Sequence, residues 1–253
     1  MPHPLNFLAK RAQIQVSIIT SIPETGVAFM RAPDVRQDDV MRLDHISYAC
    51  HSSELADVVQ RIGVDLGNTF VDGGRHPSFG TRNFTLPLAH GVYIEIVSAL
   101  DHPSAQKAPF GQAVAQRAST GGGWMSWVVA TQNLAHVEST LGRNAAAGHR
   151  IRPDGVDLHW RQLGVLDTME LPQSPFFVEW ESPKEHHPAF GGERTGIKVL
   201  SIEINCPTQD LGPLSESLEP LTNLIQWKND PEADDFGLTA VIFETPHGHV
   251  RID

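Results

Sequence analysis

The segments LDHISYAC, residues 43–50, and VYIEIVSA, residues 92–99, decide the fold of this chain. Each is a short apolar run with the spacing of a β-strand, and each carries one ionisable residue, His45 in the first and Glu95 in the second. A buried carboxylate is costly unless it is paired, hydrogen-bonded or bound to a metal. A shared pocket explains both residues. The alternative is a core histidine bonded to a backbone carbonyl and a glutamate that faces solvent.

The composition limits the class of protein. The chain has 253 residues and 40% hydrophobic content, enough for one large domain or two small ones with a buried core. Its net charge of −11 argues against nucleic acid or an anionic membrane as a partner, because both favour a basic face. Cys50 and Cys206 are its two cysteines, so we expect no disulfide framework and a cytoplasmic protein. The predicted partner is a small molecule.

Residues 1–41 show no sustained periodicity. The stretch SIPETGVAFMRAPDVRQDD, residues 21–39, is rich in turn formers and charges. An apolar piece at residues 14–22 resembles a signal peptide only faintly, because polar residues interrupt it. No apolar run approaches the roughly 20 residues that cross a bilayer. We therefore predict a flexible, dispensable leader over residues 1–41 and no membrane partner.

A first folded unit is predicted over residues 42–109. After the strand that carries His45, SSELADVVQRIGVDLG begins with a serine cap, has apolar residues at helical spacing and ends at a glycine. Turn signals then separate three further strands. The expected order is therefore βαβββ, followed by a linking helix. The predicted elements are a helix at 52–67, strands at 69–72, 81–89 and 92–99, and the linking helix at 110–120.

The second half repeats this order over residues 121–185, and internal repetition is a strong sign of a modular fold. Glu179, in PFFVEWES, falls 55 residues after Trp124, close to the 50 residues that separate His45 from Glu95. A shortened third pass, a partial βαββ unit packed on the same domain, is predicted over residues 186–253. The predicted second-module elements are strands at 123–131, 149–152 and 156–165, a helix at 133–148 and a last strand in 175–182.

The chain resembles the vicinal oxygen chelate superfamily, and more narrowly its glyoxalase-like domain proteins. The segments LDHISYA, GGRHPSFGTRN, VYIEIV and PFFVEW carry the resemblance, which extends from residue 43 to about 250. It implies an α+β fold in which paired βαβββ modules form curved mixed β-sheets around a central cavity, with a partial third module at the C-terminus.

The resemblance also implies a divalent metal in that cavity, held by the first and last strands of each module. Carried over residue by residue, the metal ligands are His45, Glu95 and Glu179. The fourth position holds Trp124, which is no ligand and is expected to form an apolar wall for the substrate. Imidazole and carboxylate donors suit Mn, Fe, Ni, Co or Zn.

Four further polar residues are candidates for substrate binding. His76 and Asn83 lie beside the turn that opens a strand, where side chains reach a ligand from a rigid scaffold. His159 and Arg161 alternate onto one face of their strand. If that face points inward, Arg161 is a natural anchor for a carboxylate. If it points outward, both side chains are merely solvated.

Two functional classes remain open from the sequence. The first is a metal-dependent enzyme of the lyase, isomerase or dioxygenase type, in which the metal polarises two substrate oxygens and Glu95 or Glu179 moves a proton. The second is a metal-free protein that binds or sequesters a small molecule in the same cavity. The surviving ligand residues favour the first and the missing fourth ligand favours the second. The sequence leaves open a monomer or a homodimer.

Overall fold

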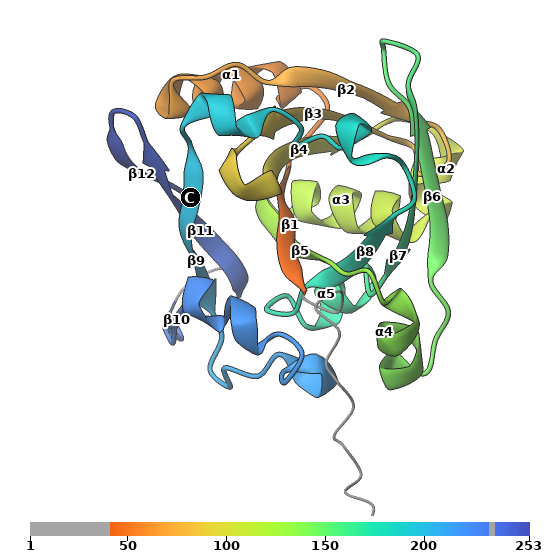
Figure 1. Ribbon diagram of the computed structural model, residues 1–253, viewed down its shortest axis with the longest axis vertical. Coiled ribbons are helices and arrows are strands. Elements are labelled where there is room, and N and C mark those ends of the chain that lie inside the picture. The colour runs from red at the N-terminus through yellow and green to blue at the C-terminus, as the bar shows by residue number, and fades with distance from the viewer. Residues whose placement is uncertain (1–40, 233–235) are drawn as a thin grey trace, which may run out of the picture. The chain divides into compact units, whose positions relative to one another are not determined.

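The described part of the protein contains two β-sheets, one of eight strands and one of four, with helices packed around them (Figure 1). The computed structural model describes residues 41–232 and 236–253. The predicted leader, apart from Met41, therefore lies outside the described residues. Among the described helices none is long and apolar enough to cross a membrane.

The first module has the predicted βαβββ order. Its helix ends at Gly67, whose φ of 64° is the left-handed conformation that closes many helices. The expected serine cap is wrong: Glu54 precedes the helix and its side chain makes no capping hydrogen bond. The elements are β1 Arg42–Ala49, α1 Leu55–Leu66, β2 Val71–His76, β3 Thr81–Pro87, the 3₁₀ turn η2 Ala89–Gly91 and β4 Tyr93–Ala99.

Two short helices link the modules, and the second module follows. Proline occupies the first turn of both linking helices, a position where its missing N–H costs nothing. In the second module Asn133 caps its helix by accepting from the backbone N–H of His136 at 3.2 Å. These elements are α2 Pro103–Lys107, α3 Pro109–Ser119, β5 Gly123–Ala130, α4 Leu134–Leu141, β6 Ala146–Ile151, β7 Asp157–Leu163, α5 Asp167–Glu170 and β8 Phe176–Trp180.

The eight-stranded sheet joins the two modules through their first strands. Its order is β2-β3-β4-β1-β5-β8-β7-β6, with β1 and β5 antiparallel at the centre. In each module the last strand runs parallel to the first, β4 beside β1 and β8 beside β5. The edge strands β2 and β6 also contact each other, so the curved sheet is nearly closed. The predicted α+β fold of paired βαβββ modules is confirmed.

The C-terminal unit differs from the module pattern. Its sheet has the order β10-β9-β11-β12, and its first strand pairs with the second and third strands instead of the last. Short 3₁₀ helices replace the expected α-helix. The elements are η3 Lys184–His186, η4 Gly192–Thr195, β9 Lys198–Asn205, η5 Gly212–Leu214, η6 Glu219–Leu224, β10 Ile225–Lys228, β11 Gly237–Thr245 and β12 Gly248–Ile252.

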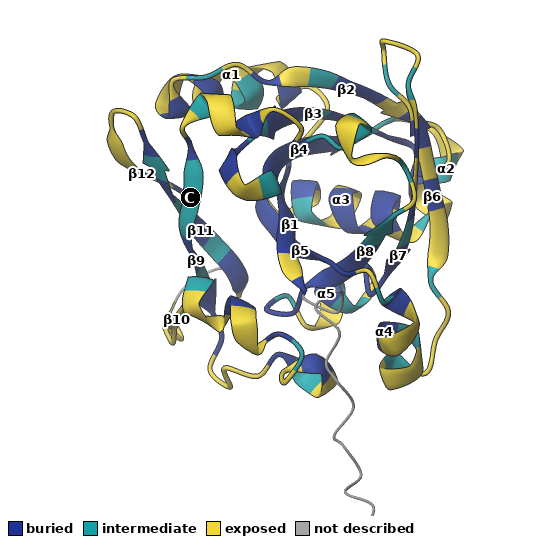
Figure 2. Cartoon of the chain, in the orientation of Figure 1, coloured by how far each residue is buried: buried dark blue, intermediate teal, exposed yellow. Residues whose placement is uncertain are grey.

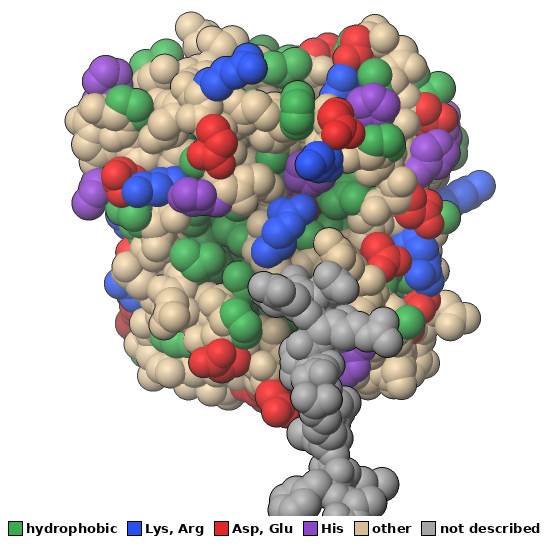
Figure 3. Space-filling model, viewed as in Figure 1, with side chains coloured by type: hydrophobic (Ala, Val, Ile, Leu, Met, Phe, Trp, Pro, Cys, Tyr) green, Lys and Arg blue, Asp and Glu red, His purple; other side chains and the backbone are tan. Residues whose placement is uncertain are grey.

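The central strands β1, β4 and β5 are buried along almost their whole length, as the dark blue colour in Figure 2 shows. One face packs against α3, where Phe110 and Val114 meet Val128. The other face packs against α1 and the four-stranded sheet, where Trp127 and Phe243 belong to one continuous core. At the surface, acidic and basic side chains are interspersed on the face seen in Figure 3.

Trp124 belongs to this second core, which corrects its predicted place in the cavity wall. Its ring packs edge-on against Tyr48, and its indole N–H donates to the carbonyl of Ile252 at 2.8 Å. The side chain therefore joins the eight-stranded sheet to β12 of the C-terminal unit. A β-bulge gives the physical reason. Regular alternation would place Trp124 on the same face as Val128, four residues further on, but β5 shifts its register against β1 between Trp124 and Ser126, and this shift turns Trp124 to the other face.

We expect Trp124→Ala to lower the free energy of unfolding by about 3–5 kcal/mol, since it leaves a cavity in the core and an unpaired carbonyl at Ile252. Urea denaturation followed by circular dichroism measures this. Phe190→Ala is the matched control, because Phe190 is 62% exposed and its loss should change stability by less than about 0.5 kcal/mol. Equal effects of the two substitutions on the free energy of unfolding would contradict the placement of Trp124 in the core.

Candidate functional site

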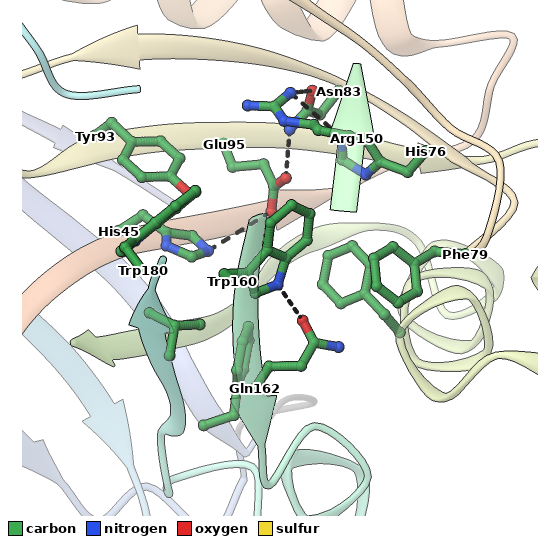
Figure 4. A pocket seen from close by; sticks show the side chains of 13 residues that line it. His45, His76, Phe79, Asn83, Tyr93, Glu95, Arg150, Trp160, Gln162 and Trp180 are labelled. Atoms are coloured by element: carbon green, nitrogen blue, oxygen red, sulfur yellow. Dashed lines mark hydrogen bonds and ion pairs between the residues drawn. The ribbon is translucent and has the colours of Figure 1, made fainter. Parts of the chain in front are cut away.

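A small cavity of about 40 Å³ lies between the two modules (Figure 4). This volume holds only a few water molecules or the end of a small ligand. One wall is polar and comes mainly from the first module, while the other is apolar and comes from the second module and α3. The polar wall contains His45, His76, Asn83, Glu95 and Arg150. The apolar wall contains Phe110, Trp160, Phe176 and Val178.

Glu95 lies at the centre of the polar wall, on β4, and is only 4% exposed. The hydroxyl of Ser47, its partner on β1, donates to Oε2 at 2.8 Å. The side-chain amide of Asn83 donates to Oε1 at 2.5 Å. Two donors thus replace the water that a carboxylate loses on burial. The carboxylate is fixed in direction and faces the cavity.

His45 faces the same cavity from β1. Its ring stacks on Tyr93 with centroids 4.5 Å apart, and its Nδ1 lies 2.9 Å from Oδ2 of Asp44. Because Asp44 accepts the Nδ1 proton, the lone pair of Nε2 is directed into the cavity. Nε2 lies 3.9 Å from Oε2 of Glu95. An imidazole and a carboxylate therefore flank one small space.

Asp44 is a functional candidate that strand periodicity misses. Regular alternation would place it on the opposite face from His45, but β1 shifts register against β5 between Leu43 and His45. Asp44 is the extra residue of this β-bulge, and the bulge turns its carboxylate toward the His45 ring. Bulges often re-aim side chains beside active sites. The adjacent pair Asp44–His45 was the only signal in the sequence.

The Asp44 carboxylate is completely buried and has several donors. The indole N–H of Trp180 donates to it, and Nε2 of His187 lies 3.1 Å away. Burial by itself raises the pKa of Asp44, but the hydrogen bonds from His187 and His45 outweigh it and hold the pKa well below its usual range. Asp44 is therefore an anion behind the His45 ring.

Arg150 is the second residue that sequence reasoning missed. It comes from the edge strand β6 of the second module and crosses to the first, where its Nη1 donates to the carbonyl of Gly73 at 2.5 Å and to Oδ1 of Asn83 at 2.8 Å. In β6 the buried residues are Gly148 and Arg150. The alternation along β6 is the sequence signal that could have predicted a buried Arg150, because it places the arginine on the same inward face as Gly148.

His76 lies beside Arg150 in a neutral form. Its Nδ1 is 3.0 Å from the hydroxyl of Thr81, and its Nε2 is 3.3 Å from Nη1 of Arg150. Burial, together with the nearby charge of Arg150, lowers the pKa of His76 to about 3. Nε2 therefore accepts from the guanidinium, and His76 positions Arg150 without adding charge.

The structure brings four of the eight predicted site residues together, namely His45, His76, Asn83 and Glu95. Their roles as ligands or binding residues stay predictions. Glu179 does not join them, because it lies on the opposite face of β8 from Val178. Its Oε2 accepts from Arg161 at 3.4 Å, and Arg161 also bonds Glu138. The predicted convergence of Glu179 with His45 and Glu95 is therefore wrong.

The charged face of β7 points outward, which corrects the expectation for His159 and Arg161. His159 is exposed and pairs with Asp157 at 3.1 Å. The inward side chains of this strand are instead Trp160 and Gln162, which line the cavity and bond each other at 2.8 Å. The sequence left open that this face points outward into solvent, and that alternative describes His159. Arg161 is partly buried in its ion pairs.

The glyoxalase-like domain family model matches residues 43–222, most of the chain. The chain belongs to the glyoxalase-like domain family. Solved structures with a similar fold include methylmalonyl-CoA epimerase from Streptomyces coelicolor, 16% identical, with a TM-score of 0.40 over 56% of this chain and 99% of that one. Methylmalonyl-CoA epimerase from Mycobacterium tuberculosis is 14% identical, with a TM-score of 0.37 over 56% and 89%. No curated protein matches.

The donors in the cavity of this glyoxalase-like protein do not fit a divalent metal. The strand registers place His45 opposite Tyr93 in one module and Val128 opposite Phe176 in the other. Val128 thus corresponds to His45 and, two residues beyond Phe176, Val178 corresponds to Glu95. Catalytic zinc sites use three protein ligands. Within the described part of the chain, no cluster of three potential ligands includes His45 or Glu95.

A cluster that could hold a cation lies elsewhere on this glyoxalase-like chain. His149, Asp157 and His159 bring three ligand atoms within 4.8 Å of one another on the exposed face of the β6–β7 pair. Asp157 already pairs with both histidines. This group is separate from the cavity, because its side chains point away from the face that carries Arg150 and Trp160.

We expect Asp44→Asn to lower the free energy of unfolding by about 1.5–3 kcal/mol near neutral pH, because the hydrogen bonds from His45 and His187 lose their charged acceptor. The lowered pKa of Asp44 stabilises the fold above the unfolded value of 3.8, and this contribution is lost as pH falls. In urea titrations, the difference in free energy of unfolding between the unaltered protein and Asp44→Asn should become smaller as the pH falls from about 5 to about 2.5. A difference that does not change with pH would contradict the stabilising role of the ionised Asp44 carboxylate.

Proposed function

We propose that this cavity binds a small oxygen-bearing molecule without a divalent metal, and that Glu95 and His45 transfer a proton on it in an isomerase- or lyase-type reaction. The observation that carries the proposal is the 3.9 Å separation of His45 Nε2 and Glu95 Oε2 across one enclosed space. Both groups can reach the same bound atoms at hydrogen-bond distance.

Each of the two groups is supported from behind in the way that proton transfer requires. Ser47 and Asn83 fix the Glu95 carboxylate as the group that removes a proton. Asp44 holds the His45 ring in one orientation and stabilises the imidazolium that forms when Nε2 takes over the proton that Glu95 has removed, before His45 returns that proton to another atom of the substrate. The apolar wall excludes bulk water, which strengthens charge interactions at the reacting atoms.

The size of the cavity limits the reacting part of the substrate to a few atoms. Two larger grooves adjoin it: one of about 1000 Å³ shares Trp180 with the cavity, and one of about 450 Å³ shares Arg150. A longer substrate would place its remainder in one of these grooves. The proposal therefore concerns the chemistry at the buried end and leaves room for a larger molecule.

The second candidate function is metal-free binding or sequestration of a small molecule. The aromatic wall formed by Phe110, Trp160 and Phe176 favours it, because such a surface holds an apolar ligand without chemistry. The two functions differ in one observable: a sequestering protein returns its ligand unchanged and without isotope exchange.

Exchange of carbon-bound hydrogen tests the proposal. Pyruvate, acetoacetate and methylmalonate are incubated with the protein in deuterium oxide, and deuterium incorporation beside the carbonyl is followed by NMR. We expect exchange of at least one compound, and Glu95→Gln should slow it by about 10²–10⁴-fold because the base is lost. Glu179→Gln is the matched control and should leave the rate unchanged. Binding without exchange would favour sequestration, and exchange that survives Glu95→Gln would overturn the assignment.

Metal content provides an independent test. After dialysis against EDTA, we expect deuterium exchange to continue, because His45 and Glu95 are the two donors left for a metal in the cavity: both ring nitrogens of His76 already have partners, Thr81 and Arg150. If elemental analysis after zinc loading finds a bound ion, His149→Ala should release it and His45→Ala should not. One equivalent of metal that is lost in both His45→Ala and Glu95→Gln would refute the metal-free proposal.

A further inference from the structure

We infer that Arg150 is an anchor for an anionic group, so that the ligands of this cavity are small carboxylates. This inference rests on the proposed function of the same cavity and adds the class of substrate. Three observations carry it: among the described residues no carboxylate forms an ion pair with the guanidinium, its position is fixed by hydrogen bonds, and a glycine makes room for it.

The charge of Arg150 has no carboxylate partner among the described residues. The side chain is only 3% exposed, and a buried charge is costly unless it is paired. The neighbouring Glu95 is held by Ser47 and Asn83 and makes no ion pair with the guanidinium. In contrast, other arginines lie within 4 Å of a carboxylate: Arg42, Arg82, Arg143, Arg152, Arg161 and Arg251.

One end of the guanidinium is fixed and the other is left for a ligand. Nη1 has two hydrogens and faces three acceptors, the carbonyl of Gly73, Oδ1 of Asn83 and Nε2 of His76. Nε and Nη2 donate to no described residue. Figure 4 shows the guanidinium beside Asn83 and His76, above the Glu95 carboxylate. A guanidinium held at one nitrogen loses little freedom when a ligand binds the others.

Gly73 makes this position of Arg150 accessible. A Cβ atom at residue 73 would clash with the side-chain oxygen of Asn83 and lie 2.5 Å from Nη1 of Arg150. β2 also shifts its register against β3 between Asp72 and Gly74, which marks residue 73 as a bulge. Three strands, β2, β3 and β6, therefore contribute to the placement of one guanidinium.

The geometry favours a carboxylate over other anions. A guanidinium presents parallel N–H groups that match the two oxygens of a carboxylate, and the cavity of about 40 Å³ has room for such a planar group. Arg150 also lines the adjoining groove of about 450 Å³, which gives an anion a route of approach. With its carboxylate on Arg150, a short ligand extends toward Glu95 and His45, where the proton is moved.

The decisive comparison uses the unaltered protein and two ligands of nearly the same shape. Pyruvate and its neutral amide, pyruvamide, are titrated at millimolar concentrations while the guanidinium and indole NMR signals are recorded. Acetate and inorganic phosphate are titrated in parallel. We expect acetate and pyruvate to shift the Arg150 signal and pyruvamide to bind about 10–100-fold more weakly. Equal binding of pyruvate and pyruvamide, a preference for phosphate, or no shift with either carboxylate would overturn the inference.

Variants separate the anchor from the fold and from the proton transfer. Arg150→Met and Gly73→Ala should each weaken pyruvate binding by about 10–100-fold. Arg161→Met, which removes an arginine outside the cavity, should leave binding unchanged, and unchanged binding in Arg150→Met would count against the anchor. Glu95→Gln should retain carboxylate binding. Binding through Arg150 without deuterium exchange would support the anchor and refute proton transfer. Equal exchange of pyruvate and pyruvamide would support proton transfer and refute the anchor.

Discussion

The burial of the Glu95 carboxylate is the constraint on which the rest of the site depends. A carboxylate this far from water needs donors, and the chain supplies them from neighbouring strands, Ser47 on β1 and Asn83 on β3. The amide nitrogen of Asn83 donates to Glu95, while its oxygen accepts from Arg150 on β6. One chain of hydrogen bonds thus runs from the centre of the sheet to its far edge. The charge at the centre and the closure of the sheet are parts of the same arrangement.

Strand periodicity predicted the order of the elements in the two modules, and the resemblance to glyoxalase-like domain proteins implied their arrangement around a cavity. Apolar runs of period two, a helix that ends at a glycine and an internal repeat predicted the two modules, and His45 and Glu95 were placed on strands that do lie side by side. Asp44 could not be predicted, because the bulge that turns it toward the His45 ring depends on pairing with β5, where the partners of Leu43 and His45 are Val129 and Val128. Arg150 was missed for a related reason, since its partners Gly73 and Asn83 become neighbours only when the sheet closes.

Glu179 shows how a one-residue error changes a functional assignment. Matching residue types between VYIEIV and PFFVEW aligns Glu95 with Glu179. The strand register instead aligns Tyr93 with Phe176, so that Val178 corresponds to Glu95. Because side chains alternate faces, this shift moves a carboxylate from the cavity to the outer surface, where it meets Arg161. The repeat is real at the level of strands, and its chemistry has diverged between the two modules.

This divergence explains why the cavity is so unequal. A symmetric pair of modules would present donors from both sides and surround a cation, whereas here Val128 and Val178 replace the second pair of donors and leave one side apolar. A positive charge is nevertheless present, because Arg150 enters from the edge strand of the module that lost its donors. A guanidinium keeps its charge at any physiological pH and needs no metal supply, and its two ends can be used separately. With Nη1 fixed by the protein, the remaining N–H groups have a fixed direction, so the position of a bound anion relative to Glu95 is set by the fold.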